Sequence, residues 1–212
     1  MQQLTRYAQT GEPANIRRAC RSVSLELIYG YCFASHEDFI VSPKFEHKFV
    51  VDSEMAFPLF FWFVHFPWMF HLLVLQSHIS AWLKGKKSGV LNDSYDRLKG
   101  KIDELIAHPE LVDKEEHETV FHHLLTPHPE KGQPSIPSKK ALWEEAVNLI
   151  AAGGETITGV MTFGVFHVLN NPNICERLTS ELKAAWPDLA TAMKYEALEK
   201  LPYLVNFSRY MV

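Results

Sequence analysis

Cysteine is scarce in this sequence of 212 residues, and its placement excludes several kinds of site. The three cysteines, Cys20, Cys32 and Cys175, are odd in number and far apart. They form no Cys-x-x-Cys pair, so the patterns of a zinc site and of a thioredoxin-type redox centre are missing. We interpret all three as core residues of a protein in a reducing compartment.

A strong excess of one charge is also missing. The 21 Lys and Arg residues and 25 Asp and Glu residues give a net charge of -4, and no long basic block occurs. Because nucleic-acid binding requires a basic patch, we expect no nucleic-acid partner. The first 18 residues contain no apolar run. We therefore expect neither a signal peptide nor an N-terminal membrane anchor, and a chain made in the cytosol.

The usual signatures of metal, nucleophilic and phosphoryl chemistry do not occur. The 11 histidines include His117, His122, His123 and His128, whose spacings of five, one and five give no pair at i and i+4. We therefore expect no metal site. There is no Gly-x-Ser-x-Gly turn and no glycine-rich phosphate loop, and no pattern indicates paired carboxylates in a polar cleft.

Apolar residues at helical spacing make up most of what is present, and they predict an all-α fold. Over residues 14–34 we expect an amphipathic helix whose apolar positions are Ile16, Ala19, Cys20, Val23, Leu27, Tyr31 and Ala34. Further helices are expected at 95–107, which looks solvent-facing, at 138–170, and from Pro172 to just before Pro187, with a short one at 195–201. Residues 126–138 form a loop with four of the 12 prolines, which we do not expect to separate domains.

Residues 55–76 contain no Asp, Glu, Lys or Arg over 22 positions. A transmembrane helix needs about 20 such residues, but Pro58 and Pro67 interrupt this stretch and two histidines lie inside it. Two interpretations stay open. One is a membrane span, and the other, which we favour, is a pair of buried or membrane-touching helical segments joined at the prolines.

The segment NLIAAGGETITGV, residues 148–160, places two glycines and a carboxylate inside the longest expected helix. Each interior glycine costs about 1 kcal/mol relative to alanine. One explanation is a break between two helices, with Gly153 as the C-terminal cap. The other is that the missing side chains let a large flat ligand lie against the helix, beside Glu155 and Thr156.

This segment, followed by FHVLNNPNICERLTSELKAAWPD and LEKLPYL, resembles the cytochrome P-450 family of haem-thiolate monooxygenases. Ala152 to Thr156 matches the family pattern of small residue, Gly, any residue, Asp or Glu, and Thr. RRACRSVSLELIYGYCFA, WFVHFPWMF and HETVFHHLL are similar to fungal members of the secondary-metabolism type. The resemblance implies an all-α partial P-450 fold with a long central distal-haem helix.

The resemblance also implies roles for individual residues. Ala152, Gly153 and Gly154 are expected to lie against the haem, and Glu155 and Thr156 are expected to deliver protons to the bound dioxygen. A lipophilic substrate would lie under a roof formed partly by residues 55–76. The implied partner is an NADPH-dependent reductase, and the implied location of a full-length member is the endoplasmic reticulum membrane. Ile157 stands where a second threonine is common.

Several family features have no counterpart in these residues. No cysteine lies in a Phe-x-x-Gly-x-Arg-x-Cys-x-Gly loop, no Glu-x-x-Arg pair follows LPYL, and the anchor and the Trp-x-x-x-Arg helix are missing. We therefore expect residues 1–212 to be a single incomplete domain, the central part of the family's domain. Alone, we expect it to be inactive, marginally stable, and cytosolic or peripheral. The alternative is a non-enzymatic helical protein that binds a membrane surface or a partner through residues 55–76.

Overall fold

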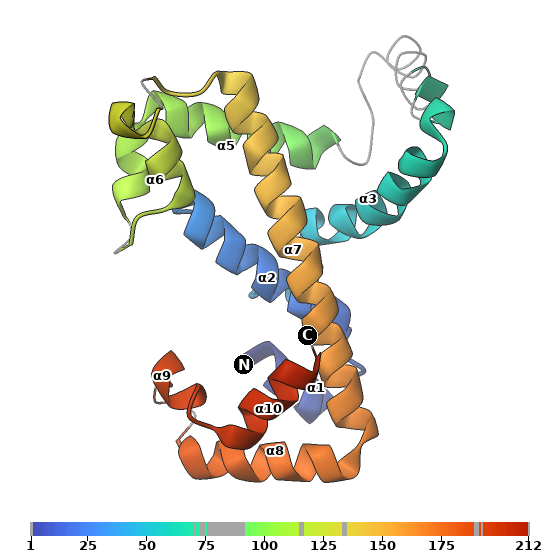
Figure 1. Ribbon diagram of the computed structural model, residues 1–212. Helices are drawn as coiled ribbons and strands as arrows, with labels where there is room; N and C mark the ends of the chain where they lie inside the picture. Colours follow the sequence, from blue (N-terminus) through green and yellow to red (C-terminus); the bar gives the residue numbers. More distant parts are fainter. Residues whose placement is uncertain are drawn as a thin grey trace. The chain divides into compact units, whose positions relative to one another are not determined.

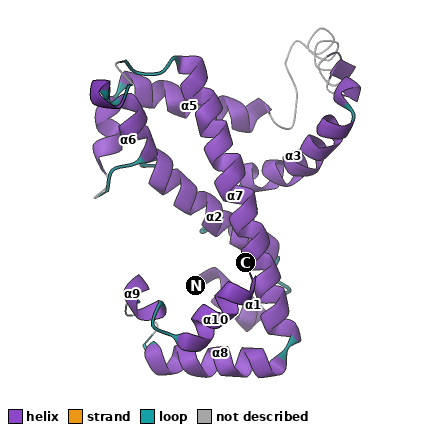
Figure 2. Ribbon diagram, in the orientation of Figure 1, coloured by secondary structure: helices purple, strands orange, loops and turns teal. Residues whose placement is uncertain are grey.

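The computed structural model describes residues 2–69, 71–72, 75, 92–114, 117–132, 135–188, 191 and 193–211. These residues contain helices and loops but no β-strand (Figure 2), so the prediction of an all-α fold is confirmed. The α-helices are α1 (Gln2–Thr10), α2 (Ile16–Phe33), α3 (Lys48–His65), α5 (Asn92–Ala107), α6 (Val120–Leu125), α7 (Lys139–Asn170), α8 (Pro172–Ala185), α9 (Tyr195–Leu198) and α10 (Pro202–Met211) (Figure 1). Short 3-10 helices lie at Pro43–Phe45, Pro109–Lys114 and Pro129–Lys131.

The chain divides into two compact units, Met1–Gly154 and Glu155–Val212. The boundary falls inside α7 and not in the proline-rich loop 126–138. α7 itself is one continuous helix of 32 residues, as expected for 138–170. The alternative of a break at Gly153 is therefore wrong.

Helix α2 is the most buried element of the first unit, with ten of its 18 residues buried. It begins at Asn15, whose side chain accepts a hydrogen bond from the Arg18 backbone N–H, and ends at Ala34 in the left-handed conformation. The predicted helix is confirmed, but its predicted buried face is partly wrong. Leu27 and Tyr31 are 61% and 58% exposed, while Leu25 and Tyr29 are buried.

The physical reason is that two rows of residues on α2 have helical spacing. Val23, Leu27 and Tyr31 are four residues apart, and so are Leu25, Tyr29 and Phe33. Neighbouring elements cover the second row, which joins the hydrophobic core. Spacing alone could not select between the rows.

The core of the first unit gathers side chains from α2, α3, α5, α6, α7 and the loop after α2. Its buried members are Leu25, Tyr29, Cys32, Phe33, Phe39, Val50, Leu98, Ile102, Leu105, Phe121, Leu125, Leu142, Ala146 and Ile150. The prediction that the helix at 95–107 is solvent-facing is therefore wrong for one of its faces. Three apolar side chains of α5 at i, i+4 and i+7 are enough to bury that face between charged positions.

Helix α3 runs through Pro58 and ends at His65, just before Phe66 and Pro67. The prediction that both prolines interrupt this stretch is wrong for Pro58. A proline removes one backbone hydrogen bond at a cost of about 3 kcal/mol, which the other turns of an 18-residue helix can offset. Residues 70, 73–74 and 76–91 lie outside the described residues, so the end of the 55–76 stretch does too.

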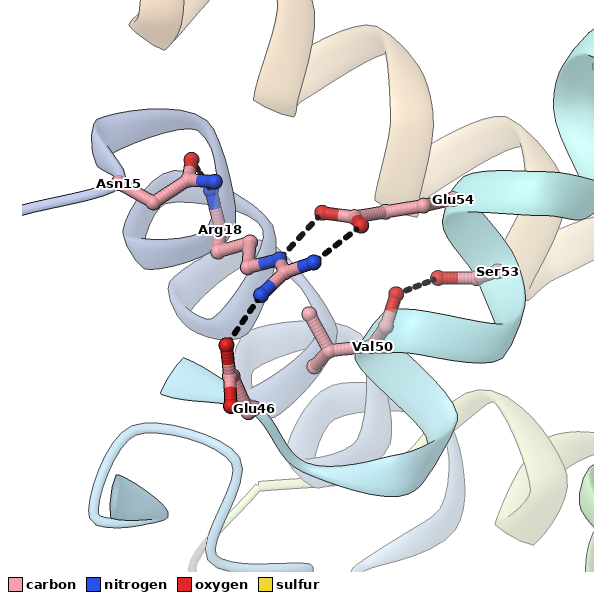
Figure 3. A network of polar contacts seen from close by, with 6 residues as sticks. All are labelled: Asn15, Arg18, Glu46, Val50, Ser53 and Glu54. Carbon is pink, nitrogen blue, oxygen red and sulfur yellow. Dashed lines mark hydrogen bonds and ion pairs between the residues drawn. The ribbon is translucent and has the colours of Figure 1, made fainter. Parts of the chain in front are cut away.

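Arg18 of α2 binds two carboxylates that flank the first half of α3 (Figure 3). Its guanidinium Nε and Nη2 donate to the two Glu54 oxygens at 2.9 and 3.0 Å, and Nη1 donates to Glu46 at 2.5 Å. The hydrogen bond with Glu54 raises the pKa of Arg18 above its usual value. This bidentate pair fixes the approach of α3 to α2.

In the second unit, α8 begins at Pro172 after the cap residue Asn171 and ends at Ala185, as predicted. The Glu181 carboxylate of α8 accepts hydrogen bonds from the backbone N–H groups of Tyr203 and Leu204, at 2.9 and 2.8 Å. Arg177 lies over the ring of Tyr203, 4.3 Å from its centre. A carboxylate of α8 therefore caps the N-terminus of α10.

Candidate functional site

The five residues of the candidate site form slightly more than one turn of α7. Ala152 and Thr156 are four residues apart and both are exposed, so they share one open face of the helix. Glu155 is half-buried beside them. The helix therefore presents a small residue and a hydroxyl on one face, with a carboxylate next to them.

Gly153 and Gly154 turn to the opposite face of α7, against α2. A Cβ atom on Gly153 would lie 2.3 Å from Cδ1 of Ile28, and one on Gly154 would lie 3.2 Å from Cδ2 of Leu25. The clearance at these two positions is thus filled by α2 side chains. The space left by the missing side chains of Gly153 and Gly154 is occupied by α2. It is therefore not available to a flat ligand, and that explanation does not hold at these two positions.

A buried hydroxyl also ties α2 to the glycine pair. The Ser24 Oγ donates to the carbonyl oxygens of Gly153 and Gly154 at 2.9 and 3.1 Å. Ser24 is fully buried. No sequence pattern pointed to Ser24, Leu25 or Ile28, because nothing local in α2 pairs them with residues 153 and 154.

The second half of α7 exposes a row of large apolar side chains. Val160, Phe163, Phe166 and Leu169 are each at least 45% exposed, and Ile157 is 40% exposed. Among the described residues, α7 is the one helix that by length and composition could cross a membrane, and 22% of its apolar window is buried. A row of this kind, next to Thr156, is a surface that favours apolar contact.

The three cysteines differ from the setting of an axial thiolate. Cys20 and Cys32 are buried in α2, and Cys175 is half-buried in α8. Burial raises the pKa of Cys32 to about 11, which disfavours the thiolate that a metal needs. Cys20 and Cys32 therefore lack the accessible thiolate that a metal needs, and Cys175 is the less buried of the three.

Several histidines contact neighbouring side chains in the described part of the chain. His108 and His128 contact Glu110 and Glu130 at 3.1 and 3.3 Å, and His123 stacks on His128. No group of three or more metal-ligating side chains gathers among the described residues.

A small cavity lies beside the core of the first unit. Its lining includes Tyr29, Glu37, His47 and Arg97, and its volume is about 30 Å³. That volume holds one or two water molecules, far less than a lipophilic substrate requires. The cavity does not provide the substrate site that the resemblance implies.

The described part of the chain is all-α, and its longest helix carries a small residue, an acid and a hydroxyl in this order. Both features agree with the monooxygenase family that the sequence resembles. The model of the family described as Cytochrome P450 matches residues 1–207, and the chain belongs to this family of oxidoreductases.

Similar proteins are fungal. Cytochrome P450 monooxygenase sdnE of Sordaria araneosa is 31% identical over 213 residues, which cover 95% of this chain and 40% of that protein. Cytochrome P450 monooxygenase macH of Penicillium terrestre is 26% identical over 93% of this chain and 38% of its own length. The grayanic acid biosynthesis cluster cytochrome P450 monooxygenase of Cladonia grayi is 27% identical over 94% and 38%. The chain spans about two fifths of the length of these relatives.

Proposed function

We propose that these residues supply the distal wall and part of the substrate roof of a haem-dependent monooxygenase of fungal secondary metabolism. The substrate would be a lipophilic small molecule, oxidised with dioxygen and electrons from an NADPH-dependent reductase. The supporting observation is the turn of α7 in which exposed Ala152 and Thr156 lie next to half-buried Glu155.

Each of these residues has a proposed task. Ala152 is small enough to let the haem approach the exposed face of the helix, whereas Gly153 and Gly154 pack against α2 and do not add to this clearance. The Thr156 hydroxyl donates a hydrogen bond on the open face, and the Glu155 carboxyl exchanges protons with solvent and passes them on. Haem, when bound, supplies the oxygen-activating chemistry. The exposed apolar row of α7 favours a substrate with little polarity.

The test uses the haem protein expressed from the complete transcript that encodes these residues, with a reductase and NADPH. Thr156→Ala should lower the product formed per NADPH consumed by about tenfold or more, because proton delivery contributes at least that much. Thr162→Ala is the matched control. Thr162 lies on the same helix, and its hydroxyl donates to the Thr158 carbonyl at 2.7 Å. Equal coupling in both variants would contradict the role of Thr156.

A second function, binding of a membrane surface, is favoured by one observation. Trp62 and Trp68, at the end of α3 and just after it, are 54% and 59% exposed, and Phe66 between them is 42% exposed. Exposed tryptophans prefer the headgroup region of a bilayer. An intact transcript that ends at the Val212 codon would favour this function over catalysis, and one that continues into Glu-x-x-Arg and a cysteine loop would favour the monooxygenase.

A further inference from the structure

We propose that Ser24 is a positioning residue for the proton-delivering turn of α7, a role that rests on the proposed function. Ser24 lies on α2, 129 residues before Gly153 in sequence, and its single hydroxyl proton is shared between two adjacent carbonyl oxygens. These carbonyls belong to the two residues directly before Glu155. The contact therefore acts on the backbone that carries the candidate proton donors.

The packing around this contact explains how α2 and α7 come close enough to form it. Leu25 and Ile28 fill the space above Gly154 and Gly153, so α2 and α7 approach closely only because residues 153 and 154 have no side chains. Ser24 lies on the same face of α2, one and four residues before them. The glycine pair of α7 and the Ser24 hydroxyl and apolar side chains of α2 thus form one contact between the two helices.

The contact affects the backbone hydrogen bonds of α7. A hydroxyl that donates to helical carbonyls adds a second hydrogen bond to oxygens that also accept from the backbone N–H groups four residues later, and it holds that turn against the neighbouring helix. The carbonyls of Gly153 and Gly154 face the N–H groups of residues 157 and 158, which follow Glu155 and Thr156 directly. Ser24 therefore biases the geometry of the turn in which both candidate proton donors lie.

Ser22 is a matched control on the same helix. It is the same residue type and is also fully buried, but its hydroxyl has no hydrogen-bond partner among the described residues. Ser22→Ala removes a buried hydroxyl without removing a contact to α7. Ser24→Ala removes the hydroxyl and the contact together.

The first readout is amide hydrogen exchange over residues 150–158 in the 212-residue chain, followed by mass spectrometry of peptides. Ser24→Ala should speed exchange there by about fivefold, the equivalent of one ordinary hydrogen bond, and Ser22→Ala should leave it unchanged. This readout does not depend on haem or on turnover. Equal exchange in the two variants would overturn the proposed contact.

The second readout is product formed per NADPH consumed in the haem protein from the complete transcript. Ser24→Ala should lower this ratio about fivefold or more through misplacement of the turn, whereas Ser22→Ala should not change it. The ratio is unaffected by the fraction of folded enzyme, so a merely structural role would not alter it. An unchanged ratio in Ser24→Ala would overturn the positioning role.

Ser24→Cys replaces the hydroxyl with a weaker donor of similar shape, and it decides the question if Ser24→Ala does not fold. Its ratio should lie between those of the wild type and of Ser24→Ala. If the wild-type protein neither binds haem nor turns over, the proposed function fails, and the exchange comparison still decides the Ser24 contact.

Discussion

At the scale of single residues, two helical glycines of the first unit meet different surroundings. An added Cβ would contact Ile28 at 2.3 Å at Gly153, whereas it would meet nothing within 4 Å at Gly100 of α5. We expect Gly100→Ala to stabilise the chain by about 0.5–1 kcal/mol through helix propensity. Gly153→Ala should be less stable than Gly100→Ala by about 1–3 kcal/mol, because the Ile28 side chain must shift to admit the new methyl group. Urea unfolding of both variants checks this, and equal stabilisation would contradict the close approach of α2.

A second residue-scale prediction concerns pH. Burial lowers the pKa of His47 below its usual value of 6.5, against the opposing charge of Glu37. The His47 ring nitrogen Nδ1 accepts the Phe49 backbone N–H at 3.3 Å, which requires the unprotonated form. Because the unfolded chain binds this proton more readily, stability should be complete above pH 6.5 and fall as the pH drops through the range below it.

The measurement is the free energy of unfolding of wild type and His47→Gln between pH 5 and about 7.5, a range chosen to include the usual histidine pKa. The variant should lose less stability on acidification than the wild type. A slope that is unchanged in His47→Gln would contradict the prediction.

At the scale of elements, sequence patterns predicted helix existence well and helix surroundings poorly. The long helix over 138–170 and the start of α8 at Asn171-Pro172 follow from local signals, namely spacing, caps and prolines. The buried row of α2 packs against aromatic side chains of other elements, Phe39, Phe49 and Phe121, and Ser24 contacts Gly153, which lies 129 positions away. No local pattern holds that information, so the candidate turn could be located from sequence but its α2 support could not.

The contact between α2 and α3 gives an element-scale prediction. The side chains of Arg18 and Glu54 are 23% and 25% exposed, so solvent screens their ion pair only in part. Arg18→Lys keeps the charge but loses the bidentate geometry, and we expect it to cost about 1 kcal/mol. Lys140→Ala, which removes an exposed pair with Glu144, should change stability by less than about 0.5 kcal/mol. Equal effects in urea unfolding would show that Arg18 does not hold α3 in place.

At the scale of the whole molecule, the function follows from the match to the family over residues 1–207 and not from the physical chemistry of the sequence alone. Composition and periodicity lead to an all-α chain with an unusual turn in its longest helix. The expectation of a haem, a reductase and a lipophilic substrate rests on membership of the family. For the chain's own residues, the proposal assigns Ala152, Glu155 and Thr156 of α7 to the side of the haem where dioxygen binds.

The last prediction follows from the cysteines. Residues 1–212, expressed alone with excess haem, should give no thiolate-type Soret shift under carbon monoxide. Cys20 and Cys32 are buried in α2, and burial raises the pKa of Cys32 to about 11, so neither offers the accessible thiolate that ligates haem iron. Cys175 is half-buried and is the remaining candidate. A thiolate-type shift that disappears in Cys175→Ser would overturn the prediction and identify Cys175 as the ligand.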